Sequence, residues 1–174
     1  MLFRSELIDI IPEFNLYEEF WKIYTKTDII PPQYISAEAV VERSIIGEGS
    51  EIHGEVYNSV IGPGVVIKKG SVVRNSIIMK QSFIGENVTI DKAIIAENVT
   101  VGNNVVMGVG EDVPNKEKPR VYSFGLVTIG ENSVIPADVR IGINTAIVGE
   151  TTPEDYPDGE LASGETLNKE GETA

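Results

Sequence analysis

A period of six residues runs through most of this chain and constrains its fold more than any other feature. An aliphatic residue is followed four positions later by a small or β-branched residue at eleven places. These pairs lie at 46/50, 52/56, 61/65, 67/71, 78/82, 84/88, 95/99, 101/105, 129/133, 135/139 and 141/145. A longer phrase also recurs at spacings of 15, 17 and 17 residues, as Ser44-Ile45-Ile46, Ser59-Val60-Ile61, Ser76-Ile77-Ile78 and Ala93-Ile94-Ile95. Such a short period is typical of chains that wind into a solenoid of short strands.

The six-residue period predicts an all-β fold, a left-handed parallel β-helix of hexapeptide repeats. Each unit supplies one strand and one corner, and three units close a triangular coil of about 18 residues. The leading aliphatic side chain points inward and stacks on its equivalent one coil away, about 4.8 Å along the axis. The predicted columns are Ile61, Ile78 and Ile95; Ile67, Ile84 and Val101; and Val73, Ile90 and Met107.

The corners of such a coil need residues that tolerate a positive φ. Gly64, Gly70, Asn87, Asn98 and Asn104 occupy the predicted corners, and Gly and Asn are the residue types that adopt this conformation most readily. The alternative fold is an antiparallel β-sandwich, which would show period-two alternation with turns roughly every eight to twelve residues. A sandwich would not place three isoleucines in one column with a 17-residue spacing, so we favour the β-helix.

The chain is expected to divide into three segments. Residues 36–147 form the β-helix, and the loop 108–125 projects from it because the rhythm lapses there. Residues 1–35 lie outside the rhythm, and we interpret them as an inter-domain linker with a short helix that Pro12 ends. Residues 148–174 carry eight acidic residues and one basic residue, and we expect them to form a disordered acidic tail.

The composition excludes several classes of function. A net charge of −13 disfavours nucleic acid as a partner, because phosphate binding needs a basic surface. The chain has no Cys and one His, which excludes disulfides, thiolate metal sites and the three-histidine zinc site of γ-class carbonic anhydrases. No apolar run reaches the roughly 18–20 residues that span a bilayer, and no signal peptide is visible. The expectation is a cytoplasmic protein without a membrane partner.

Several stretches together resemble the glucose-1-phosphate adenylyltransferases of bacterial glycogen synthesis. Phe-Asn-Leu-Tyr at 14–17, Trp-Lys-Ile-Tyr-Thr at 21–25 and Ile-Pro-Pro-Gln-Tyr-Ile at 30–35 look like the connection between that family's catalytic domain and its β-helix. Residues 58–67, 74–79 and 125–136 look like its first full coil, the next coil and the last coil. The resemblance implies a reaction in which ATP and glucose 1-phosphate give ADP-glucose and pyrophosphate with Mg²⁺, carried out by an N-terminal domain.

The residues for that chemistry are missing from this chain. It contains no Gly-rich phosphate-cradling loop after a strand, so we assign no catalytic residue, no metal ligand and no cofactor to it. The resemblance therefore implies a truncated C-terminal module for oligomerisation and regulation, inactive without its catalytic domain. Residues 1–5 do not resemble the family, and we interpret them as foreign sequence fused to the truncated chain.

Basic residues and aromatic residues supply the candidates for binding. The resemblance implies a sugar-phosphate effector between the catalytic domain and the β-helix, and a basic patch of Lys68, Arg74 and Lys92 would suit it. The alternative is an ordinary solvated surface. An aromatic segment is a candidate interface with the missing catalytic domain, or packs on the first coil, and its members are Phe14, Tyr17, Phe20 and Trp21. A homo-oligomer, or a hetero-oligomer with a paralogue, is expected.

His53 raises a second function, that of a free-standing hexapeptide acyltransferase. Such enzymes use a His as general base near a projecting loop. The loop 108–125 has no His, and His53 follows Ile52 at a position that should face solvent. We therefore expect His53 to be a surface residue and keep the acyltransferase as the alternative.

Overall fold

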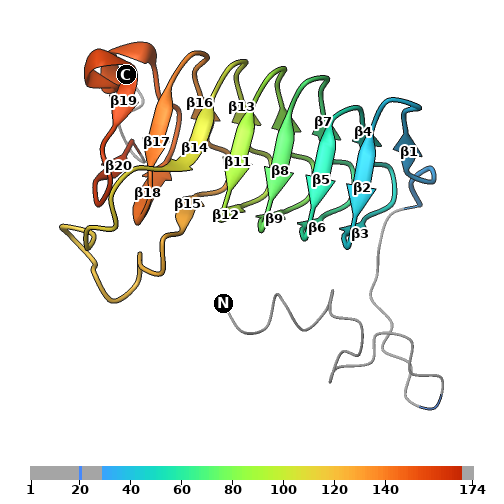
Figure 1. Cartoon of the computed structure of the whole chain (residues 1–174), viewed down its shortest axis with the longest axis horizontal. Helices are drawn as coiled ribbons and strands as arrows, with labels where there is room; N and C mark the ends of the chain where they lie inside the picture. Colours follow the sequence, from blue (N-terminus) through green and yellow to red (C-terminus); the bar gives the residue numbers. More distant parts are fainter. Residues whose placement is uncertain (1–19, 21–28, 170–174) are drawn as a thin grey trace.

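The computed structural model describes Phe20 and residues 29–169, and the continuous stretch winds into a three-sided parallel β-helix (Figure 1). Sheet A contains β1 (Tyr34–Ile35), β4 (Glu51–Ile52), β7 (Val66–Ile67), β10 (Phe83–Ile84), β13 (Thr100–Val101) and β16 (Val134–Ile135). Sheet B contains β2 (Val40–Glu42), β5 (Glu55–Tyr57), β8 (Val72–Arg74), β11 (Thr89–Asp91), β14 (Val106–Val109), β17 (Arg140–Gly142) and β19 (Glu160–Leu161). Sheet C contains β3 (Ile45–Ile46), β6 (Val60–Ile61), β9 (Ile77–Ile78), β12 (Ala93–Ile95), β15 (Val127–Ile129), β18 (Thr145–Val148) and β20 (Thr166–Asn168). This arrangement confirms the predicted fold class and is consistent with a left-handed β-helix.

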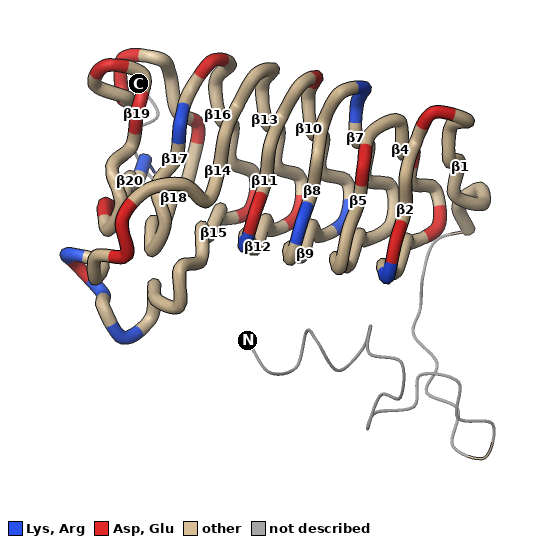
Figure 2. The backbone as a smooth tube through the Cα atoms, viewed as in Figure 1, with Lys and Arg blue, Asp and Glu red and all other residues tan. Residues whose placement is uncertain are grey.

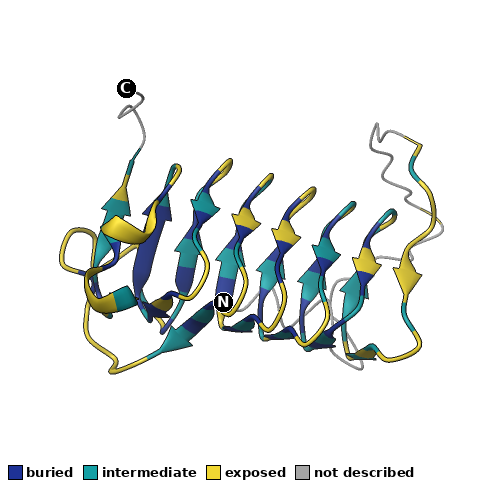
Figure 3. Ribbon diagram, turned by 90° about the horizontal axis from the view of Figure 1, so that it is seen from above, coloured by how far each residue is buried: buried dark blue, intermediate teal, exposed yellow. Residues whose placement is uncertain are grey.

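The interior columns have the predicted register. Ile78 pairs with Ile61 on one side and Ile95 on the other, and each of these three side chains is at most 1% exposed. The columns on sheets A and B are likewise buried, at 0% exposure for Ile67, Ile84, Val101, Val73, Ile90 and Met107. Buried positions recur coil after coil along the axis (Figure 3). Each buried Ile contributes about 1.5–3 kcal/mol of hydrophobic stabilisation, so the columns form the core.

The corners also follow the prediction. Gly64 and Gly70 have φ of 68° and 76°, and Asn87, Asn98 and Asn104 have φ of 56°, 57° and 58°. All five are in the left-handed region, where a side chain with a β-carbon is strained and where Gly and Asn are the least unfavourable residues.

Asparagine at a corner does more than tolerate the turn, because its amide bonds the next coil. Asn58 Nδ2 donates to Asn75 Oδ1 at 2.7 Å, and Asn75 Nδ2 donates to Asp91 Oδ1 at 2.8 Å. A second ladder runs from Asn104 Nδ2 to Asp138 Oδ1 at 2.8 Å. These ladders fix the register between coils at the surface, as the columns do in the interior.

The prediction of a disordered tail from residue 148 is wrong for residues 148–169. β19 pairs with β17 and β20 pairs with β18, so this segment adds a further coil. Tyr156 is 3% exposed, burial raises its pKa to about 12, and its hydroxyl shares a hydrogen bond of 2.8 Å with Thr151 Oγ1. The acidic side chains lie mainly on the outside, so the high charge of this segment does not prevent folding. Residues 170–174 lie outside the described part of the chain.

The β-helix begins slightly earlier than expected. β1 pairs with β4 through Tyr34 and Glu51, which places the first strand inside the predicted linker of residues 1–35. The helix expected before Pro12 and the proposed foreign residues 1–5 lie outside the described residues.

Asp155 is expected to make the last coil sensitive to acid. Its carboxylate accepts the Thr152 N–H at 2.8 Å and pairs with Lys169 Nζ at 2.9 Å, and these contacts hold its pKa below the ordinary 3.8. The stabilisation is therefore present above pH 3.8 and is lost as the pH falls through the lowered folded-state pKa. Asp155→Asn should lower the melting temperature at pH 7, and the difference from wild type should shrink as the pH falls through this window.

The matched control is Asp158→Asn, at an exposed acidic residue of the 3₁₀ turn η2 (Pro157–Gly159). This substitution should change the melting temperature little at any pH. If the Asp155→Asn difference stayed constant from pH 7 to pH 2, the link between this carboxylate and the acid sensitivity would be wrong.

Candidate functional site

Asn144 fastens both ends of the projecting loop, which spans residues 110–126 between β14 and β15. Its Nδ2 donates to Asp112 Oδ1 at 2.7 Å and to Val113 O at 2.8 Å, near the start of the loop. Its Oδ1 accepts the N–H of Gly125 at 2.8 Å, near the end of the loop. Asn144 is 3% exposed and has a φ of 56°, so the turn between β17 and β18 positions a buried amide that is fully hydrogen-bonded.

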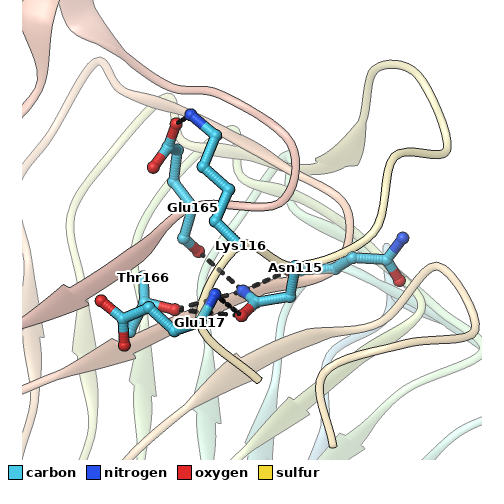
Figure 4. Close-up of polar contacts among 6 residues, drawn as sticks. Asn115, Lys116, Glu117, Glu165 and Thr166 are labelled. Atoms are coloured by element: carbon cyan, nitrogen blue, oxygen red, sulfur yellow. Dashed lines mark hydrogen bonds and ion pairs between the residues drawn. The ribbon is translucent and has the colours of Figure 1, made fainter. Parts of the chain in front are cut away.

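Asn115 fastens the middle of the same loop (Figure 4). Its Nδ2 donates to Asn144 O at 3.0 Å and to Thr166 Oγ1 at 3.1 Å. Its Oδ1 accepts the backbone N–H groups of Glu117 at 3.0 Å and Lys118 at 2.8 Å. Asn115 is 2% exposed, so its amide links the loop to the last coil from a buried position.

The loop lies against the C-terminal strands of sheet C. Lys116 forms an ion pair with Glu165, next to the strand that Asn115 contacts (Figure 4). Ala146, the outward residue of β18, pairs with Thr166 and is only 1% exposed. The loop therefore closes the outer face of sheet C at β18 and β20.

The tip of the loop combines cationic and apolar side chains. Lys116, Lys118 and Arg120 are accompanied by a single acidic residue, Glu117. Val121 is 67% exposed and Phe124 is 75% exposed. The sequence has no His in residues 110–126, so the loop itself supplies no imidazole that could act as a general base.

The basic residues predicted to bind an effector lie at two different corners. Lys68 follows β7 at the corner between sheets A and B, with its Nζ 5.7 Å from the centre of the Phe83 ring. Arg74 ends β8 at the corner between sheets B and C, and the Lys92 N–H donates to its carbonyl oxygen at 3.2 Å. The structure therefore brings Arg74 and Lys92 together and leaves Lys68 at the other edge of sheet B.

Acidic residues and an aromatic ring surround the Arg74 corner. Asp91 is directly opposite Arg74 in the register of β8 and β11, and the guanidinium carbon lies 5.2 Å from the centre of the Tyr57 ring. Basic and acidic positions are interspersed along this side of the molecule (Figure 2). The corner is an ion-balanced surface rather than a continuous basic patch, and effector binding stays a prediction.

His53 lies at the surface beside the first coil. Its side chain is 32% exposed, its ring centre lies 5.7 Å from that of Tyr34, and its Nε2 lies 3.7 Å from Glu51 Oε2. A distance of 3.7 Å exceeds a hydrogen bond, so Glu51 does not orient the imidazole as a catalytic partner would.

The interface candidates are only partly described. Phe20 has a fully exposed side chain, at 100%. Phe14, Tyr17 and Trp21 lie outside the described residues. The prediction that this aromatic segment contacts another domain therefore stays a prediction.

One surface feature was missed in the sequence, an aliphatic row on the outside of sheet C. Ile45, Val60, Ile77 and Ile94 face outward from β3, β6, β9 and β12, are half-buried and are paired in register. We call these four residues the sheet C stripe. The recurring Ser-Ile-Ile phrase contained the signal, because a strand that buries one face needs only one of two adjacent aliphatic residues inside.

The described part of the chain contains neither a metal centre nor a membrane-spanning helix. Phe20 and residues 29–169 contain no group of three His, Cys, Asp or Glu side chains arranged to hold a metal ion. They also contain no helix that is long and apolar enough to cross a membrane.

The comparison with family models decides the classification. The model described as GlmU-like, C-terminal hexapeptide matches residues 32–129, which is more than half of the 174 residues. The chain belongs to this hexapeptide family. The match covers the coils from β1 to β15 and so agrees with the observed fold.

The most informative relatives of this GlmU-like hexapeptide chain are longer enzymes. It is 64% identical to a glucose-1-phosphate adenylyltransferase of Lachnospira eligens over 169 residues, which cover 97% of this chain and 40% of that protein. It is 44% identical to the enzyme of Acetivibrio thermocellus over 98% of this chain and 40% of that protein. The chain thus spans about 40% of the length of these relatives and is homologous to their C-terminal part, which confirms the resemblance seen in the sequence.

The solved structures that match this chain are more distant in sequence. The acetyltransferase domain of PglB from Neisseria gonorrhoeae, in complex with acetyl coenzyme A, matches with a TM-score of 0.43 at 17% identity. The match covers 80% of this chain and 55% of that chain, and no function is transferred from it.

Proposed function

We propose that this chain is the C-terminal module of a glucose-1-phosphate adenylyltransferase, where it supports oligomerisation and regulation and positions the catalytic domain without catalysing the reaction itself. The observation that carries the proposal is the 64% identity over 97% of the chain to the Lachnospira eligens enzyme. A β-helix in which every coil pairs with its neighbours is a stiff scaffold, and stiffness suits a part that positions another domain.

The chemistry of the parent reaction belongs to the rest of the polypeptide in this proposal. ATP and glucose 1-phosphate would react there to give ADP-glucose and pyrophosphate, with Mg²⁺ at the phosphates. The described residues lack a three-ligand metal cluster, so no step is assigned to this chain through a metal ion. A sugar-phosphate effector would meet this chain at the corner shared by Arg74 and Lys92, with Lys68 on the opposite edge of sheet B.

A transplant of the chain tests the proposal. In a joined protein, this chain replaces the matching C-terminal 40% of the Lachnospira eligens enzyme. The joined protein is expected to form ADP-glucose from ATP and glucose 1-phosphate, whereas the isolated chain is expected to give no turnover above a buffer blank. A coupled pyrophosphate assay measures both.

The same preparation tests the acyltransferase alternative. The isolated chain should transfer no acetyl group from acetyl-CoA to sugar-amine acceptors. Turnover that is lost in His53→Ala would establish the acyltransferase and overturn the proposed function. Adenylyl transfer by the isolated chain would equally contradict it.

A further inference from the structure

The tip of the projecting loop is held in one shape by its own backbone. The carbonyl oxygen of Lys118 accepts the N–H groups of Val121 at 2.9 Å and Tyr122 at 3.0 Å, so residues 118–122 form a tight turn. Phe124 has a φ of 63°, a conformation that strains a residue with a bulky side chain, and its ring is 75% exposed. Strained residues of this kind concentrate at functional sites. A segment that is already ordered also loses little conformational entropy when it binds.

The side chains on this turn have the composition of a protein contact. We call Lys118, Arg120, Val121 and Phe124 the cationic tip, and all four are exposed. Neither cation forms an ion pair with any described residue. An Arg beside exposed aromatic and aliphatic side chains is typical of the residues that dominate binding energy in protein interfaces. The cationic tip therefore suits a partner surface that is acidic and partly apolar.

A surface with that chemistry lies in the last coil of the same chain. Residues 150–158 expose the carboxylates of Glu150, Glu154 and Asp158, and the rings of Pro153 and Pro157 lie exposed between them. We call these five residues the acidic turn. None of the three carboxylates forms an ion pair with a described residue, and residues 141–168 contain no Lys or Arg. The acidic turn thus lacks the positive charge that the cationic tip carries.

The two surfaces cannot meet within one chain. Both lie at the C-terminal end of the β-helix, but the projecting loop and the turns η1 and η2 are on opposite sides of that end (Figure 1). The acidic residues of the turns form a separate group from the basic residues of the loop (Figure 2). Each surface is therefore available to a second molecule.

We infer that the cationic tip of one copy of this chain docks on the acidic turn of a second copy, an inference that rests on the oligomerising role in the proposed function. A two-fold axis makes the contact reciprocal, so each dimer contains two identical tip-to-turn contacts. Lys118 and Arg120 meet the carboxylates, and Val121 and Phe124 pack on the proline rings. Two copies with a net charge of −13 repel each other, so association requires a local match of opposite charge such as this one.

Reversal of charge on each surface in turn tests the inference in the isolated chain. The tip variant carries Lys118→Glu and Arg120→Glu, and the turn variant carries Glu150→Lys and Glu154→Lys. Sedimentation velocity should show dimers of the unaltered chain at about 100 µM in dilute salt, and each variant alone should dimerise at least about tenfold more weakly. An equimolar mixture of the two variants should dimerise again, because both contacts of a mixed dimer then join opposite charges.

Two further variants separate the contact from general effects of charge and folding. Lys68→Glu with Lys69→Glu makes the same change in net charge as the tip variant, at the exposed corner between β7 and β8, and should leave dimerisation about as strong as in the unaltered chain. Phe124→Asn removes the ring but keeps a residue type that tolerates the φ of 63°, and it should weaken dimerisation. Circular dichroism establishes that each variant is folded. Raising the salt to about 1 M should also weaken the dimer, because charges are then screened within about 3 Å.

Three results would overturn the inference: an unaltered chain that is monomeric at every concentration, dimers that persist in the tip variant, or a mixture of tip and turn variants that stays monomeric. Slower tryptic cleavage after Arg120 in the joined protein than in a monomeric isolated chain would assign the tip to the upstream polypeptide and overturn it too. An active joined protein with any of these results overturns the tip-to-turn contact alone. An inactive joined protein, with an isolated chain that dimerises as described, overturns the adenylyltransferase proposal and leaves the contact standing.

Discussion

Ile78→Asp is expected to leave the isolated chain largely unfolded at room temperature. Ile78 is 0% exposed and lies between Ile61 and Ile95 in the central part of the sheet C column. The substitution would bury a carboxylate without a partner, at a cost of several kcal/mol out of a typical total stability of about 5–15 kcal/mol. The far-ultraviolet circular dichroism spectrum and its thermal melt measure the loss.

The adjacent residue provides the matched control. Ile77 belongs to the same strand but faces outward, so Ile77→Asp should keep the spectrum and lower the melting temperature by only a few degrees in the isolated chain. A melting temperature of Ile78→Asp close to that of wild type would mean that the register of β9 is wrong, because a shift of one residue exchanges the two faces.

Asn144→Ala is expected to release the projecting loop. The substitution leaves the Gly125 N–H and the Val113 carbonyl without the amide that now bonds them at 2.8 Å each. Unpaired buried polar groups cost about 1–3 kcal/mol each, so the melting temperature should fall by several degrees. Trypsin should cut after Lys116 and Arg120 about tenfold faster than in wild type, because cleavage requires the loop to open.

The control for this effect is Asn98→Ala. Asn98 has a φ of 57°, close to the 56° of Asn144, but it is exposed and its Nδ2 donates to Asn132 Oδ1 across a surface corner at 3.3 Å. Both substitutions therefore impose the same backbone strain, and only one removes the loop contacts. Equal rates of tryptic cleavage in the two variants would show that Asn144 does not hold the loop.

Much of the architecture could be predicted because a β-helix repeats one local rule. An inward aliphatic residue every six positions specifies the side of each strand, and the recurrence at 17 residues specifies which strands pair. The columns through Ile78, Ile84 and Ile90 were therefore readable from spacing alone. The left-handed corners were readable because few residues other than Gly and Asn suit them.

The last coil could not be predicted because its rhythm is broken and its charge is high. The 3₁₀ turns η1 (Pro153–Asp155) and η2 interrupt the spacing between β18 and β19. Leu161 and Leu167 are six residues apart, but Glu165 rather than a small or β-branched residue follows Leu161 by four positions, and Tyr156 lies outside the period. The net charge of a segment reflects its surface residues. It does not reveal the few apolar side chains through which the segment packs on the preceding coil.

The candidate sites required information that local spacing does not contain. Lys68 and Arg74 are six residues apart and therefore sit at successive corners, on different edges of one sheet. The contacts of Asn115 with Asn144 and Thr166 join residues 29 and 51 positions apart, across the loop and the last coil. The sheet C stripe becomes visible only when the four outward residues are placed on one face.

Turnover of the joined protein with and without a folded β-helix tests the proposal that this chain works as part of an adenylyltransferase. ADP-glucose formation is measured for the joined protein with the unaltered chain and with Ile78→Asp. Turnover is expected with the unaltered chain, and most of it should be lost with Ile78→Asp. The proposed function would be wrong if the joined protein were inactive under conditions in which the Lachnospira eligens enzyme is active, or if its activity survived Ile78→Asp unchanged.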